Sequence, residues 1–360
     1  MGKQGKAFGF GDKGKIGVTV DKPSYIAGEL VVGTIYVDIH SSIECDGKKA
    51  FRSRWRWRPS TDRMNVHAAL VLKVVGKEKV EFTHVRHETR DGETIAHRDQ
   101  VELDNEFFKQ KLVIFATSGR NYAPGRYSYP FEYQLPAELP GSFHINGYSQ
   151  GDIEKLSAKI KYKFKTTLDV DGFFASDLKV DCDLVVHERN FKELVASEDS
   201  TAQDVKFLCC FSRGTCQLAV AMDKSVYLPG ETAQIQCNIA NGSTVEITAM
   251  RCKLYQDITV KLAKEGSYRT FTKLMYESAF PGVPPGASLS QPQPLPLVSM
   301  HSSALQPSTK SDLIACAYRI DVECDIPWCP DVRLHLPVSI LAPELANPSD
   351  SWVLEPAKDV

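Results

Sequence analysis

Apolar and polar residues alternate with a period of two along most of the chain. Residues 16–20 and 31–39 are early examples, in which valine and isoleucine fill one parity. The same alternation returns at 218–239 and in the closing segments 314–320 and 334–341. Period two with β-branched residues is typical of strands that bury one face. The pattern therefore predicts an all-β protein.

One nine-residue phrase occurs twice. Residues 21–29 read DKPSYIAGE and residues 223–231 read DKSVYLPGE, so the offset is 223 − 21 = 202 residues. In the second copy, Pro229-Gly230 suits a tight turn, because proline fixes φ at one corner and glycine accepts a positive φ at the next. Each copy is predicted to form a strand, a turn and a strand. A repeat of this length exceeds a solenoid unit and predicts two related domains in tandem.

The length of the chain, 360 residues, fits two domains of about 150 residues each. Residues 190–206 are polar and acidic, which is typical of a linker. The predicted organisation is a leader at 1–14, a first sandwich at 15–189, a linker at 190–206, a second sandwich at 207–343 and a C-terminal tail at 344–360.

Two proline-containing stretches stand out from the other alternating runs. The first has an aromatic row of one parity, and the prolines at its ends favour an edge strand or a strand at a domain border. The row consists of Tyr127, Tyr129, Phe131, Tyr133 and Leu135. The second stretch, residues 281–311, includes Pro292, Pro294 and Pro296. We interpret it either as a polyproline II ligand or as a long crossing loop.

Composition and charge exclude several classes of protein. The chain is 42% hydrophobic and 24% charged with a net charge of −2, so no global basic excess indicates nucleic acid as a partner. No long apolar run predicts a membrane span, and the N-terminus lacks the apolar core of a secretory signal. The cysteines are then expected to stay reduced, and the Asn241 sequon unmodified, in the cytoplasm. Lipidation of Gly2, Cys209 or Cys210 is left open.

Three motifs lack the context that their chemistry needs. Gly9-x-Gly11-x-x-Gly14 matches a dinucleotide fingerprint, but a strand follows it where a helix is required. Gly147-x-Ser149-x-Gly151 matches a nucleophile elbow, but again a strand follows. Three histidines of a charged hairpin have no partner at ligand spacing. They are His84, His87 and His97. We predict no catalytic residue, metal, cofactor or enzymatic activity. A serine hydrolase that uses Ser149 is kept as a further hypothesis beside the two given below.

A lysine ladder occupies one parity of residues 159–165. Ile160, Tyr162 and Phe164 fill the other parity, so a strand here has one apolar and one basic face. The ladder consists of Lys159, Lys161, Lys163 and Lys165. Such a face attracts phosphate groups or anionic headgroups, and it also matches an ordinary solvated strand face. Both interpretations stay open.

Residues 48–63 interleave arginine with aromatic residues and include the run FRSRWRWR. If extended, this stretch places arginines on one side and aromatic rings on the other, which suits contacts with phosphates, bases or lipid. An inserted loop between strands is the alternative interpretation.

Several motifs together resemble the arrestin-domain-containing proteins, the α-arrestins. They are the repeated phrase near the start of each half, the block YSYPFEYQLPAELPGSF at 127–143, the cysteine pair at 209–210, the run 160–170 and the closing run 318–337. The resemblance covers residues 15–343. It implies two antiparallel immunoglobulin-like β-sandwiches with the arrestin fold, an N-like domain followed by a C-like domain.

The resemblance implies an adaptor, not an enzyme. Such proteins bind cytoplasmic regions of membrane proteins and act with the trafficking machinery in endocytic or endosomal sorting. The expected location is therefore the cytoplasm and, peripherally, the endosomal or plasma membrane. Anionic lipid headgroups are a further expected partner, and the lysine ladder fits phosphate or lipid contact, although no family motif assigns it. A structural subunit of a retromer-type sorting complex is the alternative.

One departure from the family changes the expected partners. Members that recruit ubiquitin ligases carry Pro-Pro-x-Tyr motifs, which WW domains bind. Here Pro284-Pro285 is followed by Gly286-Ala287. Ubiquitin-ligase WW domains are therefore not expected among the partners.

Overall fold

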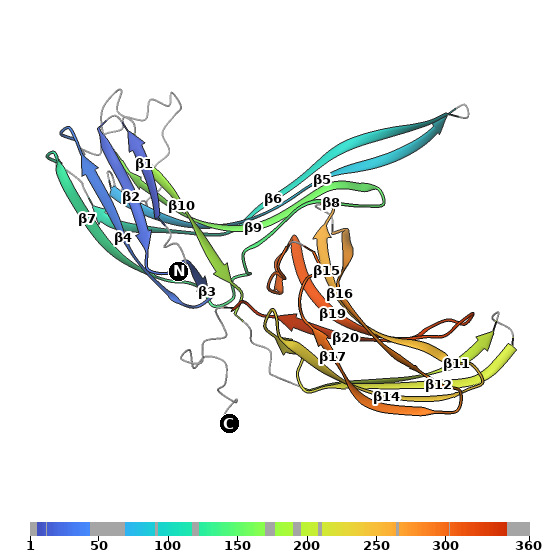
Figure 1. Cartoon of the computed structure of the whole chain (residues 1–360). Coiled ribbons are helices and arrows are strands. Elements are labelled where there is room, and N and C mark those ends of the chain that lie inside the picture. Colours follow the sequence, from blue (N-terminus) through green and yellow to red (C-terminus); the bar gives the residue numbers. More distant parts are fainter. Residues whose placement is uncertain are drawn as a thin grey trace, which may run out of the picture. The chain divides into compact units, whose positions relative to one another are not determined.

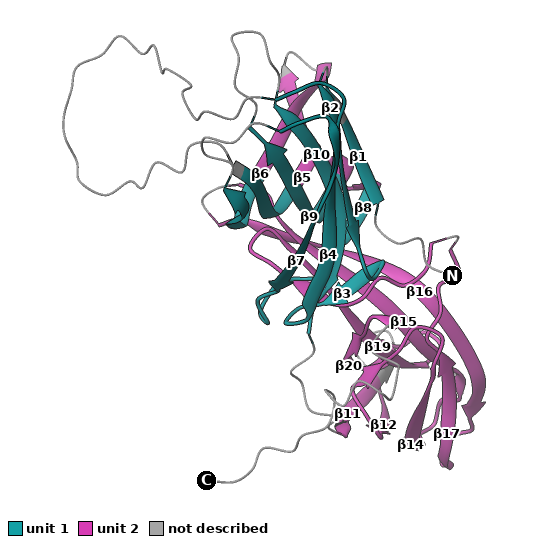
Figure 2. Ribbon diagram, turned by 90° about the vertical axis from the view of Figure 1, so that its left-hand side faces the viewer, with its two compact units in different colours: residues 1–79, 104–146, 157–189 teal, residues 80–103, 147–156, 190–360 magenta. Residues whose placement is uncertain are grey.

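The computed structural model describes residues 6–11, 13–43, 69–90, 93–116, 122–169, 177–189, 196–207, 211–263, 266–301 and 303–343. These residues form strands and turns, and none of them lies in an α-helix. The chain folds as two compact units, residues 1–79, 104–146 and 157–189 in one and residues 80–103, 147–156 and 190–360 in the other (Figure 2). The prediction of an all-β protein built from two β-sandwiches is confirmed.

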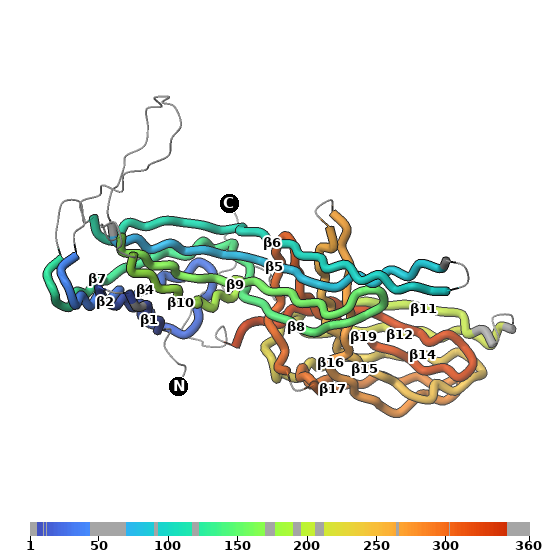
Figure 3. Tube along the Cα trace, turned by 90° about the horizontal axis from the view of Figure 1, so that it is seen from above, coloured from blue at the N-terminus to red at the C-terminus, as the bar shows by residue number. Residues whose placement is uncertain are grey.

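The first ten strands form two sheets (Figure 1). These strands are β1 (Lys6–Gly11), β2 (Gly14–Val20), β3 (Ser24–Ile26), β4 (Leu30–Ile39), β5 (Ala69–Arg90), β6 (Glu93–Ala116), β7 (Gly125–Gln134), β8 (Phe143–Gln150), β9 (Ile153–Leu168) and β10 (Leu178–His187). A four-stranded sheet has the order β1-β2-β4-β7, and a six-stranded sheet has the order β3-β10-β9-β5-β6, with β8 paired to β9. Figure 3 shows β5 and β6 running side by side next to β9.

The next ten strands repeat this arrangement. They are β11 (Ser197–Phe207), β12 (Phe211–Met222), β13 (Val226–Tyr227), β14 (Thr232–Ser243), β15 (Ile247–Lys261), β16 (Tyr268–Val283), β17 (Ser288–Pro296), β18 (Thr309–Lys310), β19 (Ile314–Asp325) and β20 (Val332–Ile340). The sheet orders are β11-β12-β14-β17 and β13-β20-β19-β15-β16, with β18 paired to β19. Both orders match those of the first half strand for strand, so the halves are structural duplicates. The short strands β3 and β13 run parallel to β10 and β20, whereas pairs such as β2–β4 and β12–β14 are antiparallel.

The repeated phrase builds the same feature in both halves. Gly28 and Gly230 each have a φ of +88°, which confirms the predicted turn at Gly230. The phrase is more than a strand, a turn and a strand, because β3 and β13 add a short strand on the opposite sheet before the chain returns through β4 and β14. Tyr25 and Tyr227 lie in these short strands, and burial raises the pKa of both hydroxyls. The phrase therefore links the two sheets of each sandwich.

Two strands lie where the sequence predicts irregular chain. Strand β1 falls within the predicted leader 1–14 and pairs with β2, and β11 falls largely within the predicted linker 190–206 and pairs with β12. Both strands are rich in glycine or polar residues and lack the alternation of a half-buried strand. Gly9 of the dinucleotide-like motif allows β1 to approach β10, because a Cβ there would lie 1.7 Å from the Lys179 carbonyl oxygen. This glycine serves packing.

The four aromatic residues of the row lie on β7, at the edge of its sheet, and Leu135 follows directly after the strand. Phe131, Tyr133 and Leu135 are buried, so both the edge position and the buried parity are confirmed for this part of the row. Tyr127 and Tyr129, nearer the start of the strand, are half-exposed. The buried part of the row therefore contributes to the core of the first sandwich at the edge of the four-stranded sheet.

Residues 288–296 form the edge strand β17, so this part of the proline-rich segment is neither a polyproline II helix nor a crossing loop. The backbone N–H of Leu297, of the odd parity, donates to the Glu231 carbonyl at 2.8 Å as the chain leaves the sheet. The backbone nitrogens of the even parity, where the prolines stand, therefore point away from β14. These prolines are Pro292, Pro294 and Pro296. Because proline has no N–H to leave unpaired, it protects a sheet edge from pairing with another chain.

Four predicted features lie outside the described residues. They are Gly2, the arginine- and tryptophan-rich stretch at 48–63, the cysteine pair at 209–210 and the tail at 344–360. Within the described ranges, no helix has the length and apolar character needed to cross a membrane.

Candidate functional site

The lysine ladder lies on β9, and the prediction of a strand with one apolar and one basic face is confirmed. Ile160, Tyr162 and Phe164 point into the core and are at most 1% exposed, whereas the lysines alternate with them on the solvent side. The Tyr162 hydroxyl donates to the Pro140 carbonyl at 2.5 Å, and burial raises its pKa. The anchored apolar side of β9 fixes the direction in which the lysines point.

Lysines of a second strand join the ladder. A groove of about 270 Å³ lies over β9 and the neighbouring strand β5. We call it the lysine groove. Its lining residues are Lys77, Lys79, Lys159, Lys161, Lys163 and Lys165, with Val75 and Asp104. Sequence reasoning missed Lys77 and Lys79. Their parity, opposite to that of the buried Leu72 and Val74, was the signal that could have placed them on a solvent face.

Carboxylates on the flanking strands pair with part of this charge. Lys163 Nζ lies 3.7 Å from Asp181 and 3.5 Å from Asp183 on β10. Lys77 Nζ lies 3.6 Å from Glu106 on β6. Within the part of the chain that the structure describes, Lys161 and Lys165 form no ion pair. Exposed ion pairs contribute little free energy. An anionic ligand can therefore replace the carboxylates that pair with Lys77 and Lys163 at a small cost in free energy.

The second half gives an internal comparison, because β19 has the place in its sheet that β9 has in the first. Tyr318 pairs with β20 as Tyr162 pairs with β10, so the four ladder positions of β9 correspond to Ala315, Ala317, Arg319 and Asp321 of β19. One of these four side chains is basic where β9 carries only lysines, and two further carboxylates, Glu323 and Asp325, follow on the same face of β19. The duplication therefore conserves the strand and changes the chemistry of its outer face.

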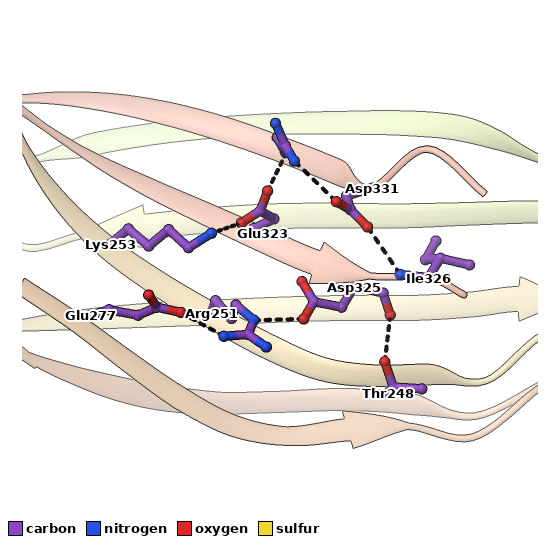
Figure 4. Close-up of polar contacts among 9 residues, drawn as sticks. Thr248, Arg251, Lys253, Glu277, Glu323, Asp325, Ile326 and Asp331 are labelled. Atoms are coloured by element: carbon purple, nitrogen blue, oxygen red, sulfur yellow. Dashed lines mark hydrogen bonds and ion pairs between the residues drawn. The ribbon is translucent and has the colours of Figure 1, made fainter. Parts of the chain in front are cut away.

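Basic residues from neighbouring strands pair with the carboxylates of β19 (Figure 4). Arg251 on β15 donates to Glu277 at 2.7 Å and to Asp325 at 2.6 Å, and these contacts raise the pKa of its guanidinium. Lys253 and Arg333 both pair with Glu323 in a second set of contacts on this face. This face of the second half is a closed set of ion pairs, whereas the lysine groove keeps an excess of positive charge.

The other motifs occupy ordinary structural positions. Ser149 lies on β8, and its Oγ accepts a hydrogen bond from the Lys155 backbone N–H at 3.0 Å across the β8–β9 hairpin. A nucleophile elbow needs a strand that turns into a helix, and this segment turns into a strand. His84 Nε2 lies 2.9 Å from Asp152, and His97 lies 3.4 Å from Glu88. Among the described residues, no three histidine, cysteine or acidic side chains are grouped as metal ligands.

The two halves match two family models. Residues 16–188 match the N-terminal domain of arrestin (or S-antigen), and residues 212–345 match its C-terminal domain. The resemblance that the motifs indicate is confirmed by these matches.

Two relatives extend the comparison. The chain is 29% identical over 343 residues to Arrestin domain-containing protein A of Dictyostelium discoideum, which covers 92% of this chain and 52% of that protein. It is 21% identical over 246 residues to Phosrestin-1 of Drosophila melanogaster, which covers 65% of this chain and 61% of that protein. The chain thus spans about half the length of the first relative and less than two thirds of the second.

Proposed function

Because the chain belongs to the arrestin family, with an N-terminal and a C-terminal arrestin domain in tandem, we propose that it is a non-enzymatic adaptor that binds cytoplasmic regions of membrane proteins. The observation that carries this proposal is the lysine groove, an anion-attracting surface on two paired strands. The two predicted domains, 15–189 and 207–343, are the proposed functional units.

The chemistry of the groove suits an anionic partner. Lysine ammonium groups donate to carboxylate or phosphate oxygens, and such charge-assisted hydrogen bonds are stronger than neutral ones. Several like charges gathered on one face also raise the rate at which an oppositely charged partner arrives. The closed network around Arg251 and Asp325 offers no comparable excess charge.

The proposed role belongs to endocytic or endosomal protein transport. The protein would act in the cytoplasm and associate peripherally with endosomal or plasma membranes through the proteins it binds. Anionic lipid headgroups are a further proposed ligand of Lys159, Lys161, Lys163 and Lys165.

Recovery of membrane proteins from a detergent extract tests the adaptor function. The immobilised full chain is compared with the variant Lys161→Glu/Lys165→Glu and with the control Lys6→Glu/Lys15→Glu, which changes the other sheet of the first sandwich. We expect the groove variant to recover about tenfold less membrane protein, since two ion pairs turn into two repulsions. Raising the salt concentration should weaken recovery by the wild type.

Equal recovery by both variants would contradict a role for the groove. An absence of membrane proteins from the wild-type eluate, under conditions in which a known adaptor recovers them, would contradict the adaptor function itself. A stoichiometric complex that survives gel filtration of a cell extract would favour a structural subunit of a sorting complex.

A further inference from the structure

Both sheets of the second sandwich direct cysteines into its core. The four-stranded sheet contributes Cys216 on β12 and Cys237 on β14. The six-stranded sheet contributes Cys252 on β15 and Cys324 on β19. All four side chains are fully buried and have free thiols. Each sheet therefore presents two thiols to the other.

One pair of these thiols is in contact across the core. The Cys324 thiol donates a hydrogen bond to the Cys216 sulfur, which lowers the pKa of Cys216 and raises that of Cys324. Two sulfur atoms that share a hydrogen bond lie roughly 4 Å apart, so a movement of the two side chains alone brings them to the ~2.05 Å of a disulfide bond. The contact thus places β12 and β19 within reach of a covalent link.

The other pair has a competing partner. The Cys252 thiol donates to Gln293 Oε1 at 3.3 Å. Contact with Cys237 and burial raise the pKa of Cys252. The thiolate is the nucleophile in cysteine oxidation, so a thiol with a raised pKa reacts slowly. Cys216, with its lowered pKa, is therefore the expected nucleophile.

The sheet edge beside Cys216 is irregular. Cys216 pairs with Gln203 of β11, which is an edge strand. The register of this pair of strands shifts directly afterwards, between Asp204 and Lys206. On β12, Gly214 has a φ of +108°. An edge strand that ends in an irregular pairing opens more readily than a regular central strand. Such an opening admits a small oxidant to Cys216.

We propose that Cys216 and Cys324 form a reversible disulfide bond between the two sheets when the protein is exposed to hydrogen peroxide. The Cys216 thiolate attacks one peroxide oxygen, the O–O bond breaks, and Cys216 becomes a sulfenic acid. The hydroxide that leaves takes up the proton that Cys216 lost. The Cys324 sulfur then displaces the sulfenic oxygen, which leaves as water, and the S–S bond forms. The two thiols lose two electrons, and one peroxide becomes two waters.

This disulfide would close a long loop. The two cysteines are 324 − 216 = 108 residues apart in the chain. A cross-link over such a distance restricts the unfolded chain, so the oxidised second sandwich should resist unfolding more than the reduced one. The inference goes beyond the adaptor function and does not depend on the lysine groove.

Peptide mapping of the full chain tests the pairing. The protein is treated with hydrogen peroxide, remaining thiols are blocked with N-ethylmaleimide, and the tryptic digest is analysed by mass spectrometry without reduction. We expect the peptide that contains Cys216 to be joined to the one that contains Cys324, and dithiothreitol to separate them. Fragment ions distinguish Cys324 from Cys329, which lies on the same tryptic peptide.

Thermal denaturation supplies the second readout. The oxidised wild type should melt about 5–10 °C above its reduced form. Cys324→Ser should show neither the joined peptides nor the shift, each variant being compared with its own reduced form. The control Cys237→Ser, at another fully buried position of the same core, should show both. If Cys324→Ser does not fold, the joined peptides of the wild type decide the question.

Each other outcome overturns the proposal in a distinguishable way. A disulfide between Cys237 and Cys252, with Cys216 still reduced, would show that the other pair is the reactive one. Oxidation of Cys216 to a sulfinic acid without a cross-link would show that Cys324 does not reach it. Thiols that resist peroxide in the folded protein and react only in urea would show that the core excludes the oxidant.

Discussion

Glu231 lies 3.0 Å from the Lys224 ammonium across the turn at the start of the second sandwich. The same carboxylate accepts a hydrogen bond from the Leu228 backbone N–H at 2.8 Å. Glu29 pairs with Lys22 in the equivalent turn of the first half at 3.1 Å. The last residue of the repeated phrase therefore closes the turn by the same contacts in both halves.

Replacing Glu231 with alanine should destabilise the second sandwich. The change removes the ion pair with Lys224 and leaves the partly buried Leu228 N–H without its acceptor. We expect the free energy of unfolding to fall by about 1–3 kcal/mol, measured by urea denaturation. Glu246→Ala, at an exposed position of the same half, is the control. Identical midpoints for the two variants would show that the turn does not depend on the carboxylate.

Gly230→Val should destabilise the protein through its backbone alone. The φ of Gly230 is +88°, and a Cβ built there meets no atom within 4 Å, so lack of space is not the cause. A β-branched residue held at positive φ costs about 1–3 kcal/mol. Asparagine tolerates this conformation better, so Gly230→Asn should lose less stability than Gly230→Val when the two variants are compared by thermal denaturation. A valine variant as stable as the asparagine variant would refute the backbone explanation.

The contribution of Asp152 to stability should depend on pH. Hydrogen bonds from Arg269 and then His84 lower the pKa of this carboxyl from 3.8 to about 2. Because the pKa is lower in the folded state, the stabilisation is complete well above pH 3.8 and is lost as the pH falls toward 2. The group is partly exposed, so the effect should stay below about 1 kcal/mol.

Unfolding of the wild type and of Asp152→Asn, measured from neutral pH down to pH 2, checks this dependence. The stability difference between the two proteins should shrink as the pH falls. Asp312→Asn, at an exposed position, should show no such trend. A difference that stays constant over the whole range would exclude ionisation of Asp152 as its source.

Removing the prolines from the edge of β17 should promote self-association. Pro292→Thr/Pro294→Thr restores N–H groups on the outward side of an edge strand, where another chain can pair with them. Light scattering of the variant should rise with concentration and time more steeply than that of the wild type. Ser288→Thr/Ser290→Thr, of the same parity on the same strand, is the matched control, since these positions already have their N–H groups. Similar scattering by both variants would remove the protective role of the prolines.

Local pattern was sufficient for the strands that bury one face. Ile160, Tyr162 and Phe164 share a parity, and this alone predicts both the strand and the outward direction of the lysines. The turn at Gly230 was also predictable from neighbouring residues, because one corner of a tight turn requires a positive φ and glycine adopts it readily. Strand β11 was not predictable from its own residues, because they are polar, and it becomes a strand by pairing with β12.

The sequence by itself determined the β class, the duplication and the basic face of β9, because period-two burial and turn chemistry are properties of neighbouring residues. Only the tertiary structure decided that Lys77 and Lys79 stand beside Lys161, although 161 − 77 = 84 residues separate the first of these lysines from it along the chain. It also decided that carboxylates of β6 and β10 border the lysine groove. Strand order and register arise from non-local pairing and packing, which an alternating pattern does not specify.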